Sequence, residues 1–78
     1  MFNHIIEETC AVWGVTERAL RGPGRQRVLA WARQEAYTRL RDESPLSYPE
    51  IGRIFDRDHT TIIKGERACR RRIKEGLH

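Results

Sequence analysis

Apolar residues recur three or four positions apart along most of this chain, which is the spacing expected of amphipathic helices. The first apolar stripe runs through Phe2, Ile5, Ile6, Cys10 and Trp13. Asn3 is a potential N-cap of this helix, and Gly14 is a potential stop after its last turn. A single helical turn is predicted next, with Thr16 as its cap and with Val15 and Leu20 turned inward.

The longest predicted helix runs from about Arg27 to Arg41. Its apolar stripe consists of Leu29, Ala32, Ala36 and Leu40, with Val28, Trp31 and Tyr37 beside it. Arg33 falls off this stripe, so we expect it at the surface. Pro45 ends the helix, because a residue that precedes proline is pushed out of helical geometry.

A short helix with clear start and stop signals is predicted from Ser47 onward. Ser47 and Glu50 fit a capping box, in which each side chain accepts a hydrogen bond from the other residue's backbone amide. Pro49 lies in the first turn, where its missing N–H costs nothing. The apolar stripe is Ile51, Ile54 and Phe55. The pair Asp56-Arg57 breaks this pattern and predicts a polar turn.

A second helix follows the turn, from His59 to about Ile73, with Asp58 as its N-cap. The residues expected to face the core are Ile62, Ala68, Cys69 and Ile73. The other faces carry Lys64, Arg67, Arg70, Arg71, Arg72 and Lys74. Two helices joined by a short turn, the second opening with polar residues and continuing into basic ones, are typical of a helix-turn-helix that reads DNA.

The charge distribution favours an anionic partner for the same part of the chain. The 78 residues suffice for one small domain, with a formal net charge of +4 and a pI near 9.7. Residues 1–14 carry two acidic and no basic residues, whereas the rest of the chain holds all 15 basic residues. Thirteen of these 15 are arginine, which suits bidentate contacts to phosphate and guanine.

A basic loop is predicted between the second and third helices, with the sequence Arg21-Gly22-Pro23-Gly24-Arg25-Gln26-Arg27. Gly-Pro-Gly rules out regular structure and favours an adaptable turn. This loop could be an exposed linker whose charge is incidental. It could also be an arm that reaches phosphates or a minor groove, whose negative potential attracts arginine. We favour the second interpretation.

Few residues support catalysis or metal binding. Cys10 and Cys69 are too few for a disulfide framework and lack metal-ligand spacing, so we expect buried free thiols. Asp58, His59 and Thr60 are adjacent on one helix and point about 100° apart, so they cannot form a catalytic triad. We expect no enzyme, no metal, no cofactor and no small-molecule substrate. With no signal peptide and no membrane-length apolar run, we also expect no membrane partner and a cytoplasmic location.

The segments Ser47–Phe55, SYPEIGRIF, and Arg57–Ile62, RDHTTI, resemble the signature of the C-terminal DNA-binding domain (domain IV) of the bacterial replication initiator DnaA. A contiguous Arg-Asp-His-Thr-Thr at the head of a helix is rare by chance. The resemblance extends from Arg25 to about Ile73, and residues 1–20 fit it as supporting helices. It implies an all-α fold in which residues 1–78 form a single domain around a Trp-repressor-like helix-turn-helix.

The resemblance also implies roles for individual residues. The residues expected to read bases are Asp58, His59 and Thr60 in the major groove and Arg25 in the minor groove. The residues expected to bind backbone phosphates are Thr61, Arg57, Arg33, Arg27, Arg21, Ser47 and Lys64. For Asp58, a plain N-cap role and base reading are both open and are compatible with each other.

These observations predict sequence-specific binding of double-stranded DNA, by a chain that we expect to be a monomer. No ATPase domain is present in the sequence, so we do not expect it to assemble an initiator filament. It could act as a stand-alone regulator of transcription, for which a phage-derived origin is one option, or occupy DnaA boxes. The alternative is an adaptor whose first helix docks replication or transcription proteins through Phe2 and Trp13, with weak DNA binding.

Overall fold

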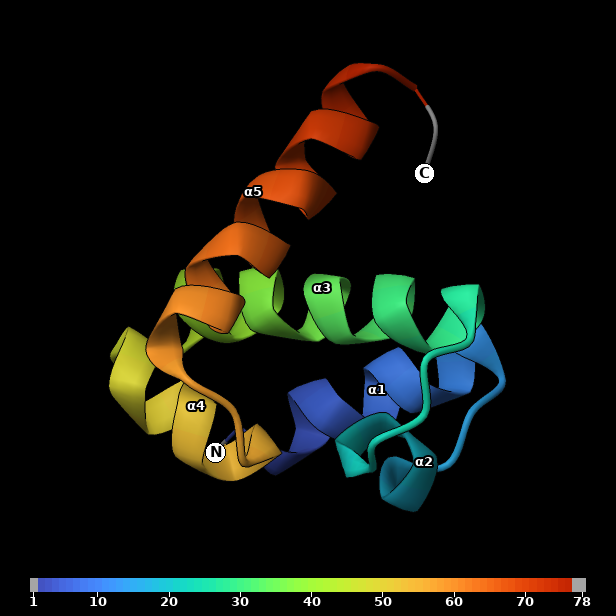
Figure 1. Ribbon diagram of the computed structural model, residues 1–78, viewed down its shortest axis with the longest axis horizontal. Coiled ribbons are helices and arrows are strands. Elements are labelled where there is room, and N and C mark those ends of the chain that lie inside the picture. The colour runs from blue at the N-terminus through green and yellow to red at the C-terminus, as the bar shows by residue number, and fades with distance from the viewer. Residues whose placement is uncertain (1, 77–78) are drawn as a thin grey trace.

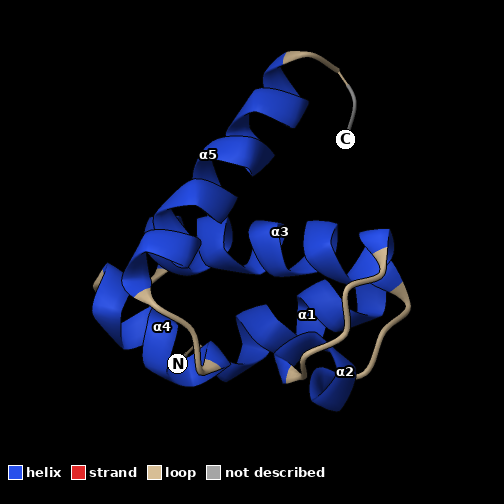
Figure 2. Cartoon of the chain, viewed as in Figure 1, coloured by secondary structure: helices blue, strands red, loops and turns tan. Residues whose placement is uncertain are grey.

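The computed structural model describes residues 2–76, in which five helices and no strand occur (Figure 2). The helices are α1 Asn3–Trp13, α2 Glu17–Arg21, α3 Arg27–Glu43, α4 Tyr48–Phe55 and α5 His59–Lys74. The all-α fold and the order of elements predicted from the sequence are confirmed. α3 ends at Glu43 rather than Arg41, and α5 ends at Lys74 rather than Ile73.

α3 lies at the centre of the fold and contacts each of the other four helices (Figure 1). α1 and α2 lie along one side of α3, and α4 and α5 form the helix-turn-helix, with α5 crossing α3 (Figure 1). The shared core consists of Ile5, Ile6, Cys10, Leu20, Ala32, Ala36, Tyr37, Leu40, Ile51, Phe55 and Ile62. Cys10 and Cys69 are buried free thiols, as predicted. Within residues 2–76, none of the helices is long and apolar enough to span a bilayer.

Local signals at the helix ends hold, except at the start of α1. Thr16 Oγ1 accepts a hydrogen bond of 3.0 Å from a backbone amide of α2, and Gly14 ends α1 with a left-handed φ of 68°. The capping box at Ser47 is present. The predicted Asn3 cap is wrong, because the helical backbone of Phe2 already occupies the cap position and Asn3 lies inside α1.

The burial of two side chains near the end of α5 is the reverse of what the sequence predicted. Arg72, predicted to be exposed, is buried: its guanidinium lies 4.3 Å from the Trp31 ring centroid and donates to the side-chain oxygen of Gln34. Ile73, predicted to face the core, is 55% exposed. The last turns of α5 extend beyond the other helices (Figure 1), so an aliphatic side chain there finds no cover, whereas a long arginine reaches back to α3.

Gly65 marks the place where α5 crosses α3. A Cβ at this position would lie 2.7 Å and 2.9 Å from two ring carbons of Tyr37. The Tyr37 ring is buried and packs edge-on against Phe55, with the ring centroids 5.0 Å apart. The absence of a side chain at Gly65 therefore sets how closely α5 approaches α3.

A series of polar contacts joins α4, α5 and the end of α3. The Tyr48 hydroxyl donates to Glu66 Oε1 at 2.6 Å, and Arg70 pairs with Glu66 at 2.5 Å and with Asp42 at 2.8 Å. Burial raises the pKa of the Glu66 carboxyl, but the hydrogen bonds from Tyr48 and Arg70 outweigh it, so this pKa lies below its ordinary value. The ionised carboxylate therefore stabilises the contact between α4 and α5.

Replacing Glu66 with glutamine is expected to remove part of the acid sensitivity of folding. A carboxyl with a lowered folded-state pKa contributes stability above its unfolded pKa, about 4.3, and loses that contribution as pH falls through the folded value. The wild-type chain should therefore lose stability more steeply below about pH 4.3 than Glu66→Gln. Thermal unfolding midpoints across this range test the prediction, which fails if the two pH profiles are parallel.

Candidate nucleic-acid interface

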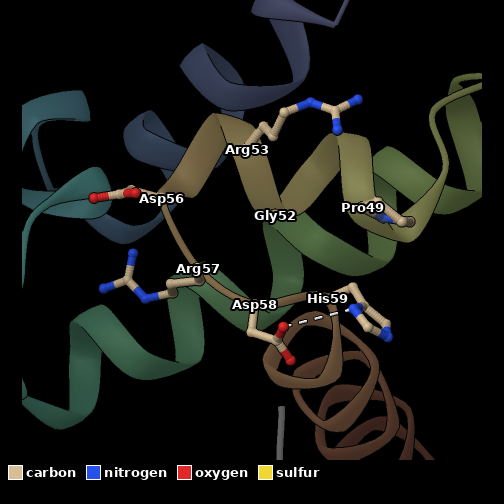
Figure 3. A pocket seen from close by; sticks show the side chains of 7 residues that line it. All are labelled: Pro49, Gly52, Arg53, Asp56, Arg57, Asp58 and His59. Carbon is tan, nitrogen blue, oxygen red and sulfur yellow. Dashed lines mark ion pairs between the residues drawn. The ribbon is translucent and has the colours of Figure 1, made fainter.

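The turn between α4 and α5 is tight and is closed by backbone contacts. Asp56 ends α4 with a left-handed φ of 54°, and the Arg57 amide donates to the Gly52 carbonyl at 2.8 Å. A Cβ on Gly52 would lie 2.5 Å from the Arg57 carbonyl oxygen. The polar turn predicted at Asp56-Arg57 is confirmed, and Gly52 allows α5 to start directly against α4 (Figure 3).

Asp58 caps α5 and presents a carboxylate at its start. Its Oδ2 accepts a hydrogen bond of 3.0 Å from the Thr60 amide, as predicted for an N-cap. Hydrogen bonding from Thr60 holds the pKa of the Asp58 carboxyl below its ordinary value, so the group is ionised at neutral pH. Its Oδ1 lies 3.6 Å from His59 Nδ1 (Figure 3). One oxygen thus orders the helix, while the side chain remains 66% exposed.

The first turn of α5 turns its other polar side chains to solvent. His59 is 54% exposed at its side chain, and Thr60 and Thr61 are exposed as well. His59 points to the opposite side of the turn from Asp56 and Arg57 (Figure 3). A shallow hollow of about 390 Å³ lies between this turn and α4. The candidate base-reading residues of α5 are therefore together and accessible.

The basic loop lies beside the helix-turn-helix, although the two are far apart in sequence. Its arginines Arg21, Arg25 and Arg27 are all exposed. Arg57 Nη2 donates to the Gly22 carbonyl at 2.7 Å, and a groove of about 360 Å³ runs where the loop meets the turn. The structure therefore brings together the two segments that the sequence marked as basic.

Arg33 is buried, so its predicted surface position is wrong. Desolvation, and to a lesser extent the nearby Arg57, lower the pKa of the Arg33 guanidinium. Its hydrogen bonds go to the backbone carbonyls of Leu20 at 2.6 Å, Gly24 at 2.5 Å, Gly22 at 2.7 Å and Ala19 at 3.0 Å. Four of its N–H donors are thus used by the protein's own carbonyls. These partners are 9 to 14 residues away, so no local pattern reveals them.

The remaining phosphate candidates occupy two places. Arg57, Thr61 and Lys64 line a groove of about 450 Å³ between α3 and α5. Arg57 is half-buried, and its Nη1 donates to the Phe55 carbonyl at 2.7 Å, so part of its guanidinium is engaged within the fold. Ser47 lies apart from this groove, at the start of α4, where its hydroxyl accepts the capping hydrogen bond.

Some exposed cations were assigned no role from the sequence. Arg53 lines the hollow between α4 and the start of α5, and its side chain projects away from Asp58 (Figure 3). Along α5, a stripe of exposed residues three or four positions apart consists of Thr60, Lys64, Arg67, Arg71 and Lys74. Within residues 2–76, none of its four cations has an ion-pair partner. Lys64 was a phosphate candidate already, and the helical spacing from Thr60 onward was the signal that could have added Arg67, Arg71 and Lys74.

The same residues offer no metal site. Across the described part of the chain, no three His, Cys, Asp or Glu side chains are grouped so that they could hold an ion. What the surface does offer is an ionised carboxylate, an imidazole, two hydroxyls and a set of arginines.

A family model described as the bacterial dnaA protein helix-turn-helix matches residues 2–69. The chain belongs to this family. The resemblance drawn from the segments Ser47–Phe55 and Arg57–Ile62 is thereby confirmed. The match to the DnaA helix-turn-helix also includes α1, α2 and the basic loop, which precede the region where motifs carried the resemblance.

A full-length protein that contains this region is also similar to the chain. The chromosomal replication initiator protein DnaA of Mycobacteroides abscessus is 43% identical to it over 75 residues. These residues cover 88% of this chain and 15% of the relative. The similarity therefore concerns the DnaA helix-turn-helix region and not the greater part of the relative.

Proposed function

We propose that this chain binds double-stranded DNA in a sequence-selective manner, with α5 in the major groove and the basic loop in the adjacent minor groove. The observation that carries the proposal is the exposure of the polar residues in the first turn of α5, directly beside the basic loop. Membership of the DnaA helix-turn-helix family supports the same function. The activity is binding, without catalysis.

In this proposal the start of α5 reads base edges. The ionised Asp58 accepts from the amino group of a cytosine, and His59 donates to the N7 of a purine. The Thr60 methyl and hydroxyl meet a thymine. Thr61 binds a phosphate, a contact favoured by the positive end of the helix dipole. Each group has the donor, acceptor or apolar character that its partner requires.

The arginines supply contacts to the backbone and to the minor groove. Arg25 enters the minor groove, where negative potential favours a guanidinium. Phosphates are bound by Arg21, Arg27, Arg57, Lys64 and Ser47, and the unpaired cations of the α5 stripe add to the attraction. Affinity should therefore fall steeply with added salt, because each neutralised phosphate releases counterions.

We further propose that the preferred sites are DnaA boxes. Occupying them would regulate promoters that carry a box, or would compete with the initiator for the same sites. The adaptor alternative receives less support, because Phe2 and Trp13 are partly buried and pack against this chain's own core.

Fluorescence anisotropy with a DnaA-box duplex and a scrambled duplex of equal length tests the proposal. We expect the box to bind at least about a hundredfold more tightly, with a steep salt dependence for both duplexes. Equal affinities that vanish together as salt is raised would contradict sequence-selective reading, while leaving electrostatic binding intact.

His59→Ala is the matched variant for this measurement. Losing one base contact should reduce discrimination at one position of the box by roughly five- to a hundredfold and leave the salt slope nearly unchanged. A uniform loss of affinity for every duplex would instead mean that His59 acts on the backbone.

A further inference from the structure

Two arginines from distant parts of the chain hold the Gly-Pro-Gly loop in place by hydrogen bonds to its backbone and to the end of α2. Arg33 and Arg57 together donate five hydrogen bonds to carbonyls between Ala19 and Gly24. Both guanidiniums donate from Nη2 to the Gly22 carbonyl, each at 2.7 Å. A loop whose composition predicts an adaptable turn is therefore connected both to α3 and to the turn of the helix-turn-helix.

This arrangement is specific to arginine. The Arg33 guanidinium uses four N–H donors on four different carbonyls, a pattern that the compact ammonium of lysine cannot reproduce. Two of these carbonyls, those of Ala19 and Leu20, belong to the C-terminal end of α2, where a cation is favoured. Within residues 2–76, neither Arg33 nor Arg57 forms an ion pair with a carboxylate. The backbone carbonyls are thus the main partners of both cations.

The hydrogen bonds from Arg33 and Arg57 restrain the backbone next to Arg25. Arg25 directly follows Gly24, whose carbonyl accepts from Arg33 Nη1 at 2.5 Å. Arg57 directly precedes Asp58, the cap of α5. Through Gly22, the backbone that carries Arg25 is thus held at a set distance from the backbone that carries the first turn of α5.

We propose that Arg33 is a positioning residue, which together with Arg57 latches the loop so that Arg25 is aligned with the major-groove readers before DNA binds. The inference rests on the proposed function, since the alignment matters only if both segments contact one duplex. A preordered loop binds more tightly, because less conformational entropy is lost on binding. Arg33 thereby influences minor-groove affinity without touching DNA.

The first experiment needs no DNA. Arg33→Lys keeps the charge and the aliphatic stem but loses the planar guanidinium and the four N–H donors that bind the carbonyls. Arg39→Lys is the control, because Arg39 lies on the same helix and pairs instead with Glu8 and Glu43. We expect trypsin to cut after Arg25 roughly tenfold faster in Arg33→Lys than in wild type or Arg39→Lys, with all three folded by circular dichroism. Unchanged cleavage would overturn the latch. If Arg33→Lys does not fold, Arg57→Lys, which removes one of the five hydrogen bonds, takes its place in the same assay.

The second experiment is a double-mutant cycle of Arg25→Ala and Arg33→Lys on a DnaA-box duplex. We expect Arg25→Ala to weaken binding roughly tenfold in the wild-type background and less than about twofold in the Arg33→Lys background. Equal effects of Arg25→Ala in both backgrounds would overturn the positioning role. Additive losses, together with a smaller salt slope for Arg33→Gln, which removes the charge, would identify a direct phosphate contact instead. If wild type shows no preference for the box, the proposed function fails, and the trypsin result still decides whether the latch exists.

Discussion

Gly52→Ala is expected to destabilise the fold by roughly 3 kcal/mol, although alanine is the better helix former by up to about 1 kcal/mol. The added Cβ would lie 2.5 Å from the Arg57 carbonyl oxygen and 3.5 Å from the His59 amide. Neither atom belongs to a flexible side chain, so the clash can be relieved only by moving the turn. The same movement displaces the first turn of α5, so DNA affinity should fall with stability.

Denaturant unfolding of Gly52→Ala and of Arg53→Ala measures this effect. Arg53 is the next residue of the same helix and is exposed, so its replacement should change the free energy of unfolding by less than about 0.5 kcal/mol. A Gly52→Ala variant that is more stable than wild type would show that helix propensity dominates and that α4 and α5 do not approach closely at this point.

The contrast between these neighbours reflects what a sequence can reveal. The capping box at Ser47, the cap at Asp58 and the stop at Gly14 depend on residues within one turn of each other, and all were predictable. Gly52 itself was visible only as one residue of a family motif. Its contact with Arg57 depends on how the turn folds back on α4, and helical periodicity does not encode that geometry.

Arginine was the residue type on which prediction from the sequence was least reliable. Arg33 and Arg72 look like surface cations in a helical pattern, yet both are buried. Each has a long apolar stem and a planar head that binds carbonyls or stacks on an aromatic ring, and its partners lie 9 to 41 positions away. Charge counting therefore overestimates the cations available to DNA. Of the cationic phosphate candidates, Lys64 and the loop arginines Arg21 and Arg27 keep exposed side chains.

The candidate base readers were predictable because their chemistry is local. Asp58, His59, Thr60 and Thr61 occupy consecutive positions, and their exposure follows from their place at a helix start. Their relation to Arg25 was not predictable, because it depends on hydrogen bonds between residues that are up to 35 positions apart. Recognition in two grooves would thus combine consecutive residues at the start of α5 with an Arg25 that is placed by long-range hydrogen bonds.

Asp58 combines two roles that a pair of variants separates. One carboxylate oxygen accepts the capping hydrogen bond from Thr60, and the other remains beside His59 at the exposed surface. Serine is about as good an N-cap as aspartate, but it lacks the second oxygen and the charge, whereas alanine lacks the cap as well. Asp58→Ser should therefore keep nearly the wild-type melting temperature, and Asp58→Ala should lower it by about 5 °C.

Both variants should lose discrimination for the cytosine that Asp58 faces, by roughly five- to a hundredfold, because neither offers a carboxylate to its amino group. Competition binding against boxes changed at one base pair at a time measures this loss, and the changed position at which the variants cease to discriminate identifies the base. If Asp58→Ser retained full discrimination, Asp58 would act only as the cap of α5. If Asp58→Ala lost affinity equally for all duplexes and Asp58→Ser lost none, the effect would come from fraying of the helix start, and reading would rest on His59 and Thr60 alone.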